Sequence, residues 1–403
     1  MRGDDQPAPA RHAHDRHERN VARPGRSGSQ TRARAEHTER CHDASMSRVL
    51  AVAPVLPGPA HPQERIDDAV LPLLAADDSR RTLARRLHAS SGVRTRHLAL
   101  PLPDYAGLTT FARANEHFVR EGTDLAEEAA RAALAAAGVP PQDVDLLFFT
   151  SVTGISAPSL DAALVGRLGL RPDVRRVPSF GLGCSGGAAG LGLLHEYLRG
   201  TPGGRALLVS VELCSLTFQR DDASTANLVS SGLFGDGASA VVMAGEDVEV
   251  PPGRVAPEVV GTRSRLYPGT ERQLGWDVRD TGFGIVLSAE LPRLLRAHLA
   301  GDVKDLLAAH DLQVSDVGTW VVHAGGPKIV DAVRDALGLD DAALARTRAT
   351  LAAEGNLSSS SVLHVLASTL DDGAPPPGGW AVLMAFGPGV SAELVLLRGR
   401  EVA

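Results

Sequence analysis

The chain contains the same strand–helix pattern twice, and this repetition limits the folds it can adopt more than any other feature. In the first half, VDLLFFTSVTG is followed by a helical segment that ends ALVGRLGL; in the second half, VGTWVVHAGG is followed by one that ends VRDALGL. GCSGGAAGLGLLHEYL and GNLSSSSVLHVLASTL form a second matching pair, each with glycine and small residues ahead of an apolar helical pattern. Such a duplication predicts two similar units packed around a pseudo-twofold axis.

Several strands in this pattern are apolar along their whole length. The segments VDLLFFTSVTG, RALLVSVEL and VGTWVVHAGG contain too few polar residues for strands with one face in water. We therefore expect an α/β fold in which helices cover both faces of the sheet. Because the pattern begins again after Pro251 and Pro252, we predict an N-terminal half over residues 46–249 and a C-terminal half over residues 250–403.

Residues 1–45 differ from everything that follows them. They are rich in Arg, His, Pro, Ser and Gly and have almost no periodic apolar residues. Such a segment cannot bury enough apolar surface to offset the entropy that is lost on ordering. We therefore expect a disordered N-terminal extension, with the folded sequence and its natural start at Met46.

The composition excludes several classes of function. The 403 residues are 43% hydrophobic, enough for a large core, and the net charge of -7 argues against nucleic acid as the main partner. The 3 cysteines, one of them in the extension, do not suggest a disulfide framework, so we expect a reducing, cytoplasmic setting. The sequence has no apolar run long enough to span a membrane, and no zinc-binding spacing, P-loop or dinucleotide-binding motif.

Cys184 is the first candidate catalytic residue. It follows glycines in VPSFGLGCSGG and precedes a helical pattern, so its sulfur is predicted to lie at a helix N-terminus. The helix dipole and the free N–H groups there favour a thiolate and lower the pKa of the thiol. A small buried cysteine at a contact between a helix and the sheet is the alternative.

His323 and Asn356 are predicted to complete a site with Cys184. His323 follows the buried strand VGTWVV, at the strand end where open α/β sheets hold their ligands. Asn356 occupies the position in its half that Cys184 occupies in the other, so the two are expected to meet where the halves join. Taken singly, a core histidine and a helix N-cap are the ordinary interpretations of His323 and Asn356.

The three residue types together suit one reaction, the decarboxylative condensation of thioesters. Cysteine can hold an acyl group, and a histidine beside it can form an imidazolium–thiolate pair. The N–H groups of histidine and asparagine can stabilise an oxyanion. Loss of CO2 from a malonyl unit creates an enolate without a separate base, so the reaction requires no catalytic carboxylate. The enolate carbon then attacks the acyl group held on Cys184.

Five motifs in this order resemble those of the type III polyketide synthases, the chalcone synthase-like family of the thiolase superfamily. They are GCSGG at Cys184, LFGDGASA, WVVHAGGPKI at His323, GNLSSSSVL at Asn356, and AFGPG near the C-terminus. The resemblance covers nearly all of residues 46–403. It implies a thiolase-like fold with two duplicated α/β halves in five αβαβα layers, and a homodimer with one active-site cavity in each subunit.

The resemblance also implies a reaction and its substrates. An acyl starter would be loaded from coenzyme A onto Cys184, extended with malonyl-CoA and cyclised to a pyrone or resorcinol-type product, with no cofactor or metal. The segment DTGFGIVLS is similar to that of bacterial members that make alkylpyrones or alkylresorcinols from fatty acyl-CoA. A ketoacyl synthase III-like enzyme that stops after one extension is the alternative enzyme, and a catalytically silent scaffold is the alternative outside catalysis.

Further site residues follow from the same resemblance. Phe234 in LFGDG corresponds to the family's aromatic gatekeeper beside the thiolate and the malonyl group, with an ordinary core phenylalanine as the alternative. The other predicted cavity positions are Ile285, as a second gatekeeper, and Cys214, Thr217, Trp276 and Ser358. Arg94 and Arg96 lie near the family's basic CoA site in alignment, and a solvated run of charge accounts for them equally well.

Overall fold

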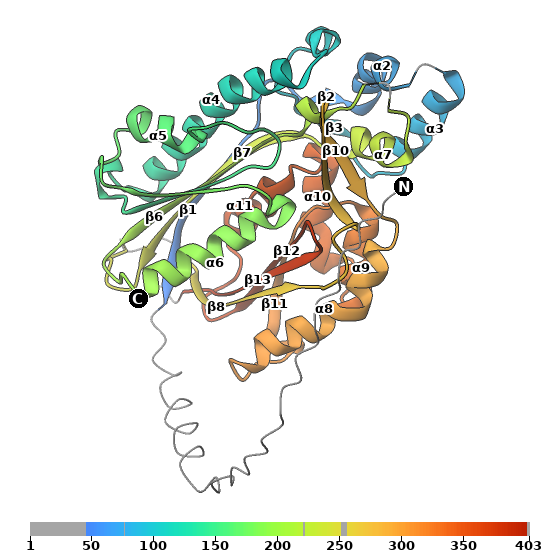
Figure 1. Cartoon of the computed structure of the whole chain (residues 1–403). Coiled ribbons are helices and arrows are strands. Elements are labelled where there is room, and N and C mark those ends of the chain that lie inside the picture. The colour runs from blue at the N-terminus through green and yellow to red at the C-terminus, as the bar shows by residue number, and fades with distance from the viewer. Residues whose placement is uncertain (1–45, 76, 221, 251–255, 401–403) are drawn as a thin grey trace, which may run out of the picture. The chain divides into compact units, whose positions relative to one another are not determined.

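The computed structural model describes residues 46–403 except 76, 221, 251–255 and 401–403, so the prediction for residues 1–45 lies outside the described residues. Within the described part, nine strands form one mixed sheet in the order β11-β12-β13-β8-β1-β7-β6-β4-β5 (Figure 1). The strands of this sheet are β1 (Ser47–Val55), β4 (Leu146–Thr150), β5 (Arg175–Ser179), β6 (Arg205–Leu213), β7 (Asp236–Gly245), β8 (Glu258–Leu266), β11 (Val317–Val322), β12 (Trp380–Gly387) and β13 (Ser391–Arg398).

The strand directions confirm the duplication that the sequence predicts. In the N-terminal half, β4 and β6 are parallel, β7 is antiparallel to β6, and β1 is antiparallel to β7. In the C-terminal half, β11 and β12 are parallel, β13 is antiparallel to β12, and β8 is antiparallel to β13. The halves join where β1 and β8 pair antiparallel, at Ser47 with Val259 and Arg48 with Glu258. β5 extends the N-terminal half beside β4.

The helices complete five layers, as the resemblance implies. α4 and α5 cover the outer face of the N-terminal half, α6 and α11 lie between the two halves, and α8 and α9 cover the outer face of the C-terminal half (Figure 1). The helices are α2 (Gln63–Leu74), α3 (Asp78–Ala89), α4 (Phe111–Ala137), α5 (Leu160–Leu168), α6 (Gly186–Arg199), α7 (Thr225–Leu233), α8 (Leu291–Ala308), α9 (Pro327–Leu337), α10 (Ala345–Glu354) and α11 (Ser361–Asp371).

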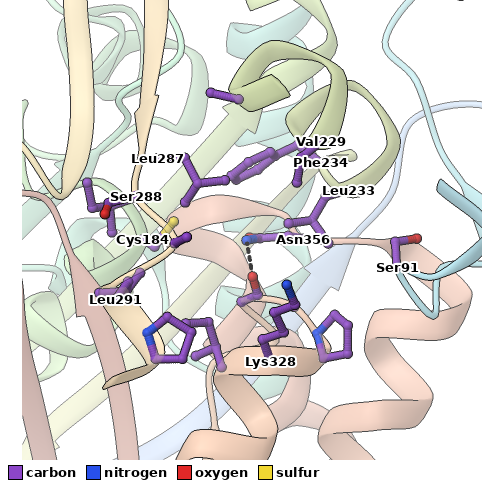
Figure 2. Close-up of a pocket in the computed structure, with 18 of the residues that line it drawn as sticks. Ser91, Cys184, Val229, Leu233, Phe234, Leu287, Ser288, Leu291, Lys328 and Asn356 are labelled. Carbon is purple, nitrogen blue, oxygen red and sulfur yellow. Dashed lines mark hydrogen bonds between the residues drawn. The ribbon is translucent and has the colours of Figure 1, made fainter. Parts of the chain in front are cut away.

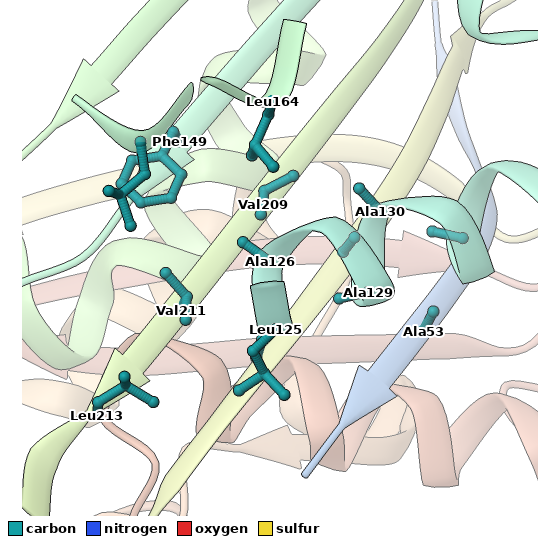
Figure 3. Packing of buried hydrophobic residues seen from close by; sticks show 14 of the residues in the cluster. Ala53, Leu125, Ala126, Ala129, Ala130, Phe149, Leu164, Val209, Val211 and Leu213 are labelled. Atoms are coloured by element: carbon teal, nitrogen blue, oxygen red, sulfur yellow. The ribbon is translucent and has the colours of Figure 1, made fainter. Parts of the chain in front are cut away.

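The alanine-rich face of α4 explains why this helix covers the sheet so closely. Ala126, Ala129 and Ala130 are fully buried against the sheet, where they face branched side chains such as Val209 and Val211 of β6 (Figure 3). Alanine favours the helix and adds little bulk between its axis and the strands. The helix ends at Gly138, whose φ of 66° is the left-handed conformation that closes a helix, as the sequence predicts.

Two smaller sheets lie apart from the main one. β9 (Leu274–Arg279) and β10 (Gly282–Leu287) form an antiparallel hairpin, and β2 (His61–Pro62) pairs with β3 (Thr95–Arg96). The hairpin carries Trp276 and Ile285, which pair directly across it. Among the described residues, no helix has both the length and the apolar character needed to cross a bilayer.

Candidate active site

Cys184 lies in a single helical turn, Gly183–Ser185, that leads directly into α6. Two features of Gly183 exclude any larger residue there. Its φ is 52°, and a Cβ would lie 2.5 Å from Cδ of Pro388 in the AFGPG loop. A Cβ at Gly186 would lie 2.6 Å from Oγ1 of Thr150, so glycine allows α6 to begin against β4. These glycines place the sulfur at the start of a helix, as the sequence predicts.

Asn356 lies at the matching position in the C-terminal half, ahead of α11. Its side-chain oxygen accepts hydrogen bonds from the Ser358 N–H at 2.8 Å and the Ser361 hydroxyl at 3.3 Å. With the oxygen held on that side, the amide nitrogen donates to the Gly325 carbonyl at 3.4 Å, a bond drawn in Figure 2. Asn356 is therefore an oriented donor, and not the N-cap of α11, which begins at Ser361.

His323 immediately follows β11, at the C-terminal end of a parallel strand. Its N–H donates to the Met384 carbonyl at 2.9 Å, which continues the β11–β12 pairing by one residue. Gly325 and Gly326 then turn the chain, and α9 begins at Pro327. The His323 ring is 2% exposed, and no hydrogen-bond partner for its Nδ1 is found among the described residues. The position of the ring is thus set by the backbone of His323 and not by a hydrogen bond to Nδ1.

One cavity of about 480 Å³ is lined by Cys184, His323, Asn356 and Phe234. Figure 2 shows Cys184, Phe234 and Asn356 around it. Its remaining lining is mainly apolar, contributed by α3, α7, the end of β10 and the start of α8 and α9. Representative lining residues are Leu87, Val229, Leu233, Leu287, Leu291 and Ile329. A concave, mostly apolar chamber with a few convergent polar groups is the usual form of a small-molecule site.

Four of the predicted cavity residues line a different space. Cys214, Thr217, Trp276 and Ile285 surround a void of only about 10 Å³, which Phe234 also lines. Phe234 therefore belongs to both spaces, and it stands between the main cavity and this void. Ser358, the remaining predicted residue, lines neither space, but its Oγ accepts a hydrogen bond from the Cys184 thiol at 3.7 Å.

The electrostatics of the site differ from the sequence-based expectation. Burial raises the pKa of Cys184 to about 12, against opposing hydrogen bonds from the side chains of Ser358 and Asn356, and nearby Glu212 adds to the rise. Burial also lowers the pKa of His323 to about 3. The expectation of a lowered thiol pKa at a helix N-terminus was wrong, because desolvation of the sulfur outweighs the helix and hydrogen-bond effects. Burial therefore favours the neutral form of each group.

Two buried charged residues lie near the site, and the sequence analysis named only one of them, Arg96, as a residue near the CoA site. Glu212 in β6 accepts hydrogen bonds from the Thr153 hydroxyl at 2.9 Å and the Val152 N–H at 3.1 Å, and a further one from the Ser359 hydroxyl. A lone glutamate in the apolar strand RALLVSVEL was the available signal. Burial raises the pKa of this carboxyl.

Arg96 is the second of these residues, and the structure corrects its interpretation. Its side chain is fully buried, so a solvated run of charge was the wrong account of it, and it does not line the cavity. Arg94 is exposed and does not line the cavity either. The cationic side chain among the cavity's lining residues is Lys328, at the start of α9.

Comparisons with known proteins agree with this geometry. The family model for the N-terminal domain of chalcone and stilbene synthases matches residues 34–247, and the model for their C-terminal domain matches residues 258–401. The chain is 53% identical over 353 residues to the 1,3,6,8-tetrahydroxynaphthalene synthase of Streptomyces peucetius subsp. caesius, covering 87% of this chain and 92% of the relative. It is 32% identical over 334 residues to the alpha-pyrone synthesis polyketide synthase-like Pks18 of Mycobacterium tuberculosis, covering 80% and 84%.

A solved structure extends the agreement to three dimensions. The crystal structure of the 1,3,6,8-tetrahydroxynaphthalene synthase from Streptomyces coelicolor A3(2), a bacterial type III polyketide synthase, matches with a TM-score of 0.81 at 32% identity. The match covers 88% of this chain and 99% of that one. The chain therefore belongs to the chalcone and stilbene synthase family and is a type III polyketide synthase, an acyl-transferring enzyme that joins carbon units by decarboxylative condensation.

Proposed function

We propose that this enzyme builds a small aromatic polyketide from malonyl-CoA and takes no long acyl starter. The observation that carries the proposal is the void of about 10 Å³ behind Phe234, bounded by Trp276 and Ile285. A space of this size holds about one water molecule. A fatty acyl chain on Cys184 has no room to extend past Phe234 toward these residues. The 1,3,6,8-tetrahydroxynaphthalene synthases of two Streptomyces species, to which the chain is 53% and 35% identical, support this class of product.

In the proposed loading step, Cys184 acts as the nucleophile and His323 as the base. The sulfur attacks the thioester carbonyl of the starter, and the neutral imidazole takes the thiol proton. The C–S bond to coenzyme A then breaks, and the imidazolium returns the proton to the departing sulfur. Burial favours the neutral imidazole of His323, and the neutral ring is the form that can accept a proton.

In the proposed extension step, His323 and Asn356 hold the thioester oxygen of malonyl-CoA. Loss of CO2 leaves its electron pair on the neighbouring carbon, and the two N–H donors stabilise the enolate oxygen. The enolate carbon attacks the acyl carbonyl on Cys184, and the C–S bond to Cys184 breaks. This releases the thiolate and the lengthened chain on coenzyme A. Because the malonyl carboxylate supplies the electron pair, we propose that the enzyme needs no resident cofactor or metal.

We also propose that the enzyme is a homodimer that pairs through the β5 side of the sheet. β5 is the edge strand of the N-terminal half, and large apolar side chains are exposed beside it. Val177 in β5 is 42% exposed, Phe180 just after it is 51% exposed, and Leu193 of α6 is 51% exposed. Exposed apolar side chains gathered at an open strand edge favour association. Light scattering on the wild type and on Val177→Lys tests this, and two monomeric proteins of equal mass would refute it.

Incubation with malonyl-CoA alone tests the proposed substrate. We expect product mass spectrometry to show a cyclised aromatic compound built from whole two-carbon units. A panel of short, medium and long acyl-CoA starters serves as the comparison. Formation of alkylpyrones from a long-chain starter, with no product from malonyl-CoA alone, would refute the proposal. A single β-ketoacyl product would favour the ketoacyl synthase III-like alternative.

A further inference from the structure

A fully buried arginine lies directly behind the segment that carries Phe234. Arg96 is 0% exposed, and its guanidinium donates to the Phe234 carbonyl at 2.5 Å and to the Gln63 side-chain oxygen at 3.0 Å. Its other terminal nitrogen has no hydrogen-bond partner among the described residues. A buried charge is costly unless it is paired and hydrogen-bonded, so a fold that keeps one incompletely satisfied requires a specific explanation.

The charge on Arg96 is balanced by carboxylates rather than by solvent. Burial lowers the pKa of Arg96 to about 10, and Asp67 and Asp236 oppose that change, so the guanidinium stays charged at neutral pH. Gln63 links Arg96 to Asp67, because its side-chain amide donates a hydrogen bond to the Asp67 carboxylate at 2.8 Å. Asp67 in turn contacts Nδ1 of His88 at 2.6 Å.

This network reaches α7, which forms one wall of the cavity. Nε2 of His88 lies 2.8 Å from the Leu228 carbonyl in α7. Two residues of the same helix, Val229 and Leu233, line the cavity, and Phe234 follows directly. A Cβ at Gly232 would collide with the His88 ring, so the helix is packed tightly against the network. Arg96 and His88 thus hold α7 and Phe234 from behind.

Arg96 also contacts the segment that carries Asn356. Cδ of Arg96 would lie 3.0 Å from a Cβ at Gly355, whose φ is 78°. Beside this contact, Asn356 N–H donates to the Leu233 carbonyl at 2.8 Å, and Gly235 N–H donates to the Asn356 carbonyl at 3.0 Å. The aliphatic part of the Arg96 side chain packs against Gly355, next to Asn356. Its guanidinium bonds to the carbonyl of Phe234, on the other side of the bridge.

We propose that Arg96 is a positioning residue that fixes the spacing between Phe234 and Asn356, and that it thereby controls chain extension more than starter loading. It does not line the cavity, so it acts through the two residues that do. Extension needs the Asn356 amide at the enolate oxygen and Phe234 beside the malonyl group, whereas loading needs Cys184 and His323. The inference rests on the proposed roles of these four residues.

The test compares Arg96→Lys and Arg96→Gln with a matched control. Arg48→Gln is the control, because Arg48 also donates to a backbone carbonyl, that of Val248 at 3.0 Å, and lies outside the cavity lining. Two rates are measured in each variant: acylation of Cys184 by acetyl-CoA, from the intact protein mass, and CO2 release from malonyl-CoA. The length of the polyketide product is measured alongside.

We expect Arg96→Gln to retain acylation while CO2 release falls at least tenfold and the products become shorter. Arg96→Lys keeps the charge but lacks the planar guanidinium that reaches both acceptors, so it should fall between the wild type and Arg96→Gln. It also supplies the measurement if the glutamine variant does not fold. Equal losses of both rates, or losses matched by Arg48→Gln, would overturn the proposal. If the wild type releases CO2 but forms no aromatic product, the proposed function fails while the ratio of the two rates still tests Arg96.

Discussion

Phe234 and Asn356 lie side by side as the two members of a parallel β-bridge that joins the N-terminal and C-terminal halves. The bridge places a large aromatic ring and an oriented amide at the same wall of one cavity. Phe234 also borders the small void behind that wall. The residue that limits space and the residue that is proposed to stabilise the enolate are therefore set by the same backbone contact.

Replacing Phe234 tests whether it separates the two spaces. Phe234→Ala should merge the cavity with the void and admit longer starters or longer products. The cavity left behind should cost about 3–5 kcal/mol of stability, whereas Phe234→Leu should cost less and shift products less. Starter panels with product mass spectrometry, together with thermal unfolding, check both effects. A Phe234→Ala enzyme that folds and keeps the wild-type product range would contradict the role.

Trp276 provides a second test of the space behind Phe234. Trp276→Ala should enlarge the void, and kcat/KM for hexanoyl-CoA should rise about tenfold or more, because each accommodated methylene contributes roughly 1–3 kcal/mol of discrimination. Trp380→Ala is the matched control, since Trp380 stacks with Arg398 at the start of β12 and is not among the residues that line either space. An equal change in both variants would show that stability, not volume, is responsible.

Replacing Asn356 should separate the two chemical steps. Asn356→Ala removes one of the two proposed enolate donors, so malonyl decarboxylation should fall by about 10²–10³, as for loss of one oxyanion donor elsewhere. Acylation of Cys184 should change little, because loading forms no enolate. Asn115→Ala serves as a control, since that half-buried amide bonds to the Ile155 backbone and does not line the cavity. Equal losses in loading and decarboxylation would argue against the assigned role.

The buried histidines should make the protein less stable in acid. The folded-state pKa of His323 is lowered to about 3, so below the ordinary value of 6.5 the unfolded chain binds a proton that the folded chain does not. Stability contributed by this ring is complete above pH 6.5 and is lost toward pH 3, by at most about 1.4 kcal/mol for each pH unit. His323→Gln should therefore flatten the pH dependence of the urea midpoint between pH 4 and pH 7.

His195 supplies the comparison for that measurement. Burial lowers its pKa to about 4, and it bonds to the Ser47 hydroxyl, away from the cavity lining. His195→Gln should flatten the same curve while leaving CO2 release intact. An unchanged slope in His323→Gln would mean that His323 is protonated in the folded enzyme, as an imidazolium–thiolate pair requires.

The sequence predicted the elements whose patterns are local. RALLVSVEL corresponds to β6 over Arg205–Leu213, and the glycine stop predicted for α4 lies at Gly138. α7 was not predicted, because TANLVSSGL is short and rich in serine and asparagine, and its position depends on contacts with distant His88. The β9–β10 hairpin was also not predicted, since glycines interrupt its strands.

The site could be predicted in composition but not in shape. Cys184, His323 and Asn356 stand in recognisable motifs, and the structure brings them into one cavity. The separation of Trp276 and Ile285 into a small void depends on side-chain packing between elements far apart in sequence. The raised thiol pKa likewise depends on burial, which no local pattern reveals. The predicted division between residues 249 and 250 and the predicted cytoplasmic setting stay predictions.

The central claim is that Cys184 holds the growing chain in this cavity while malonyl-CoA extends it. The most direct test incubates wild type and Cys184→Ala with isotope-labelled malonyl-CoA, followed by peptide mapping and product analysis. We expect label on the Cys184 peptide and a labelled cyclic polyketide from the wild type, and a loss of product by about four orders of magnitude or more in the variant. Label on another residue, or a labelled polyketide made equally well by Cys184→Ala, would contradict the account.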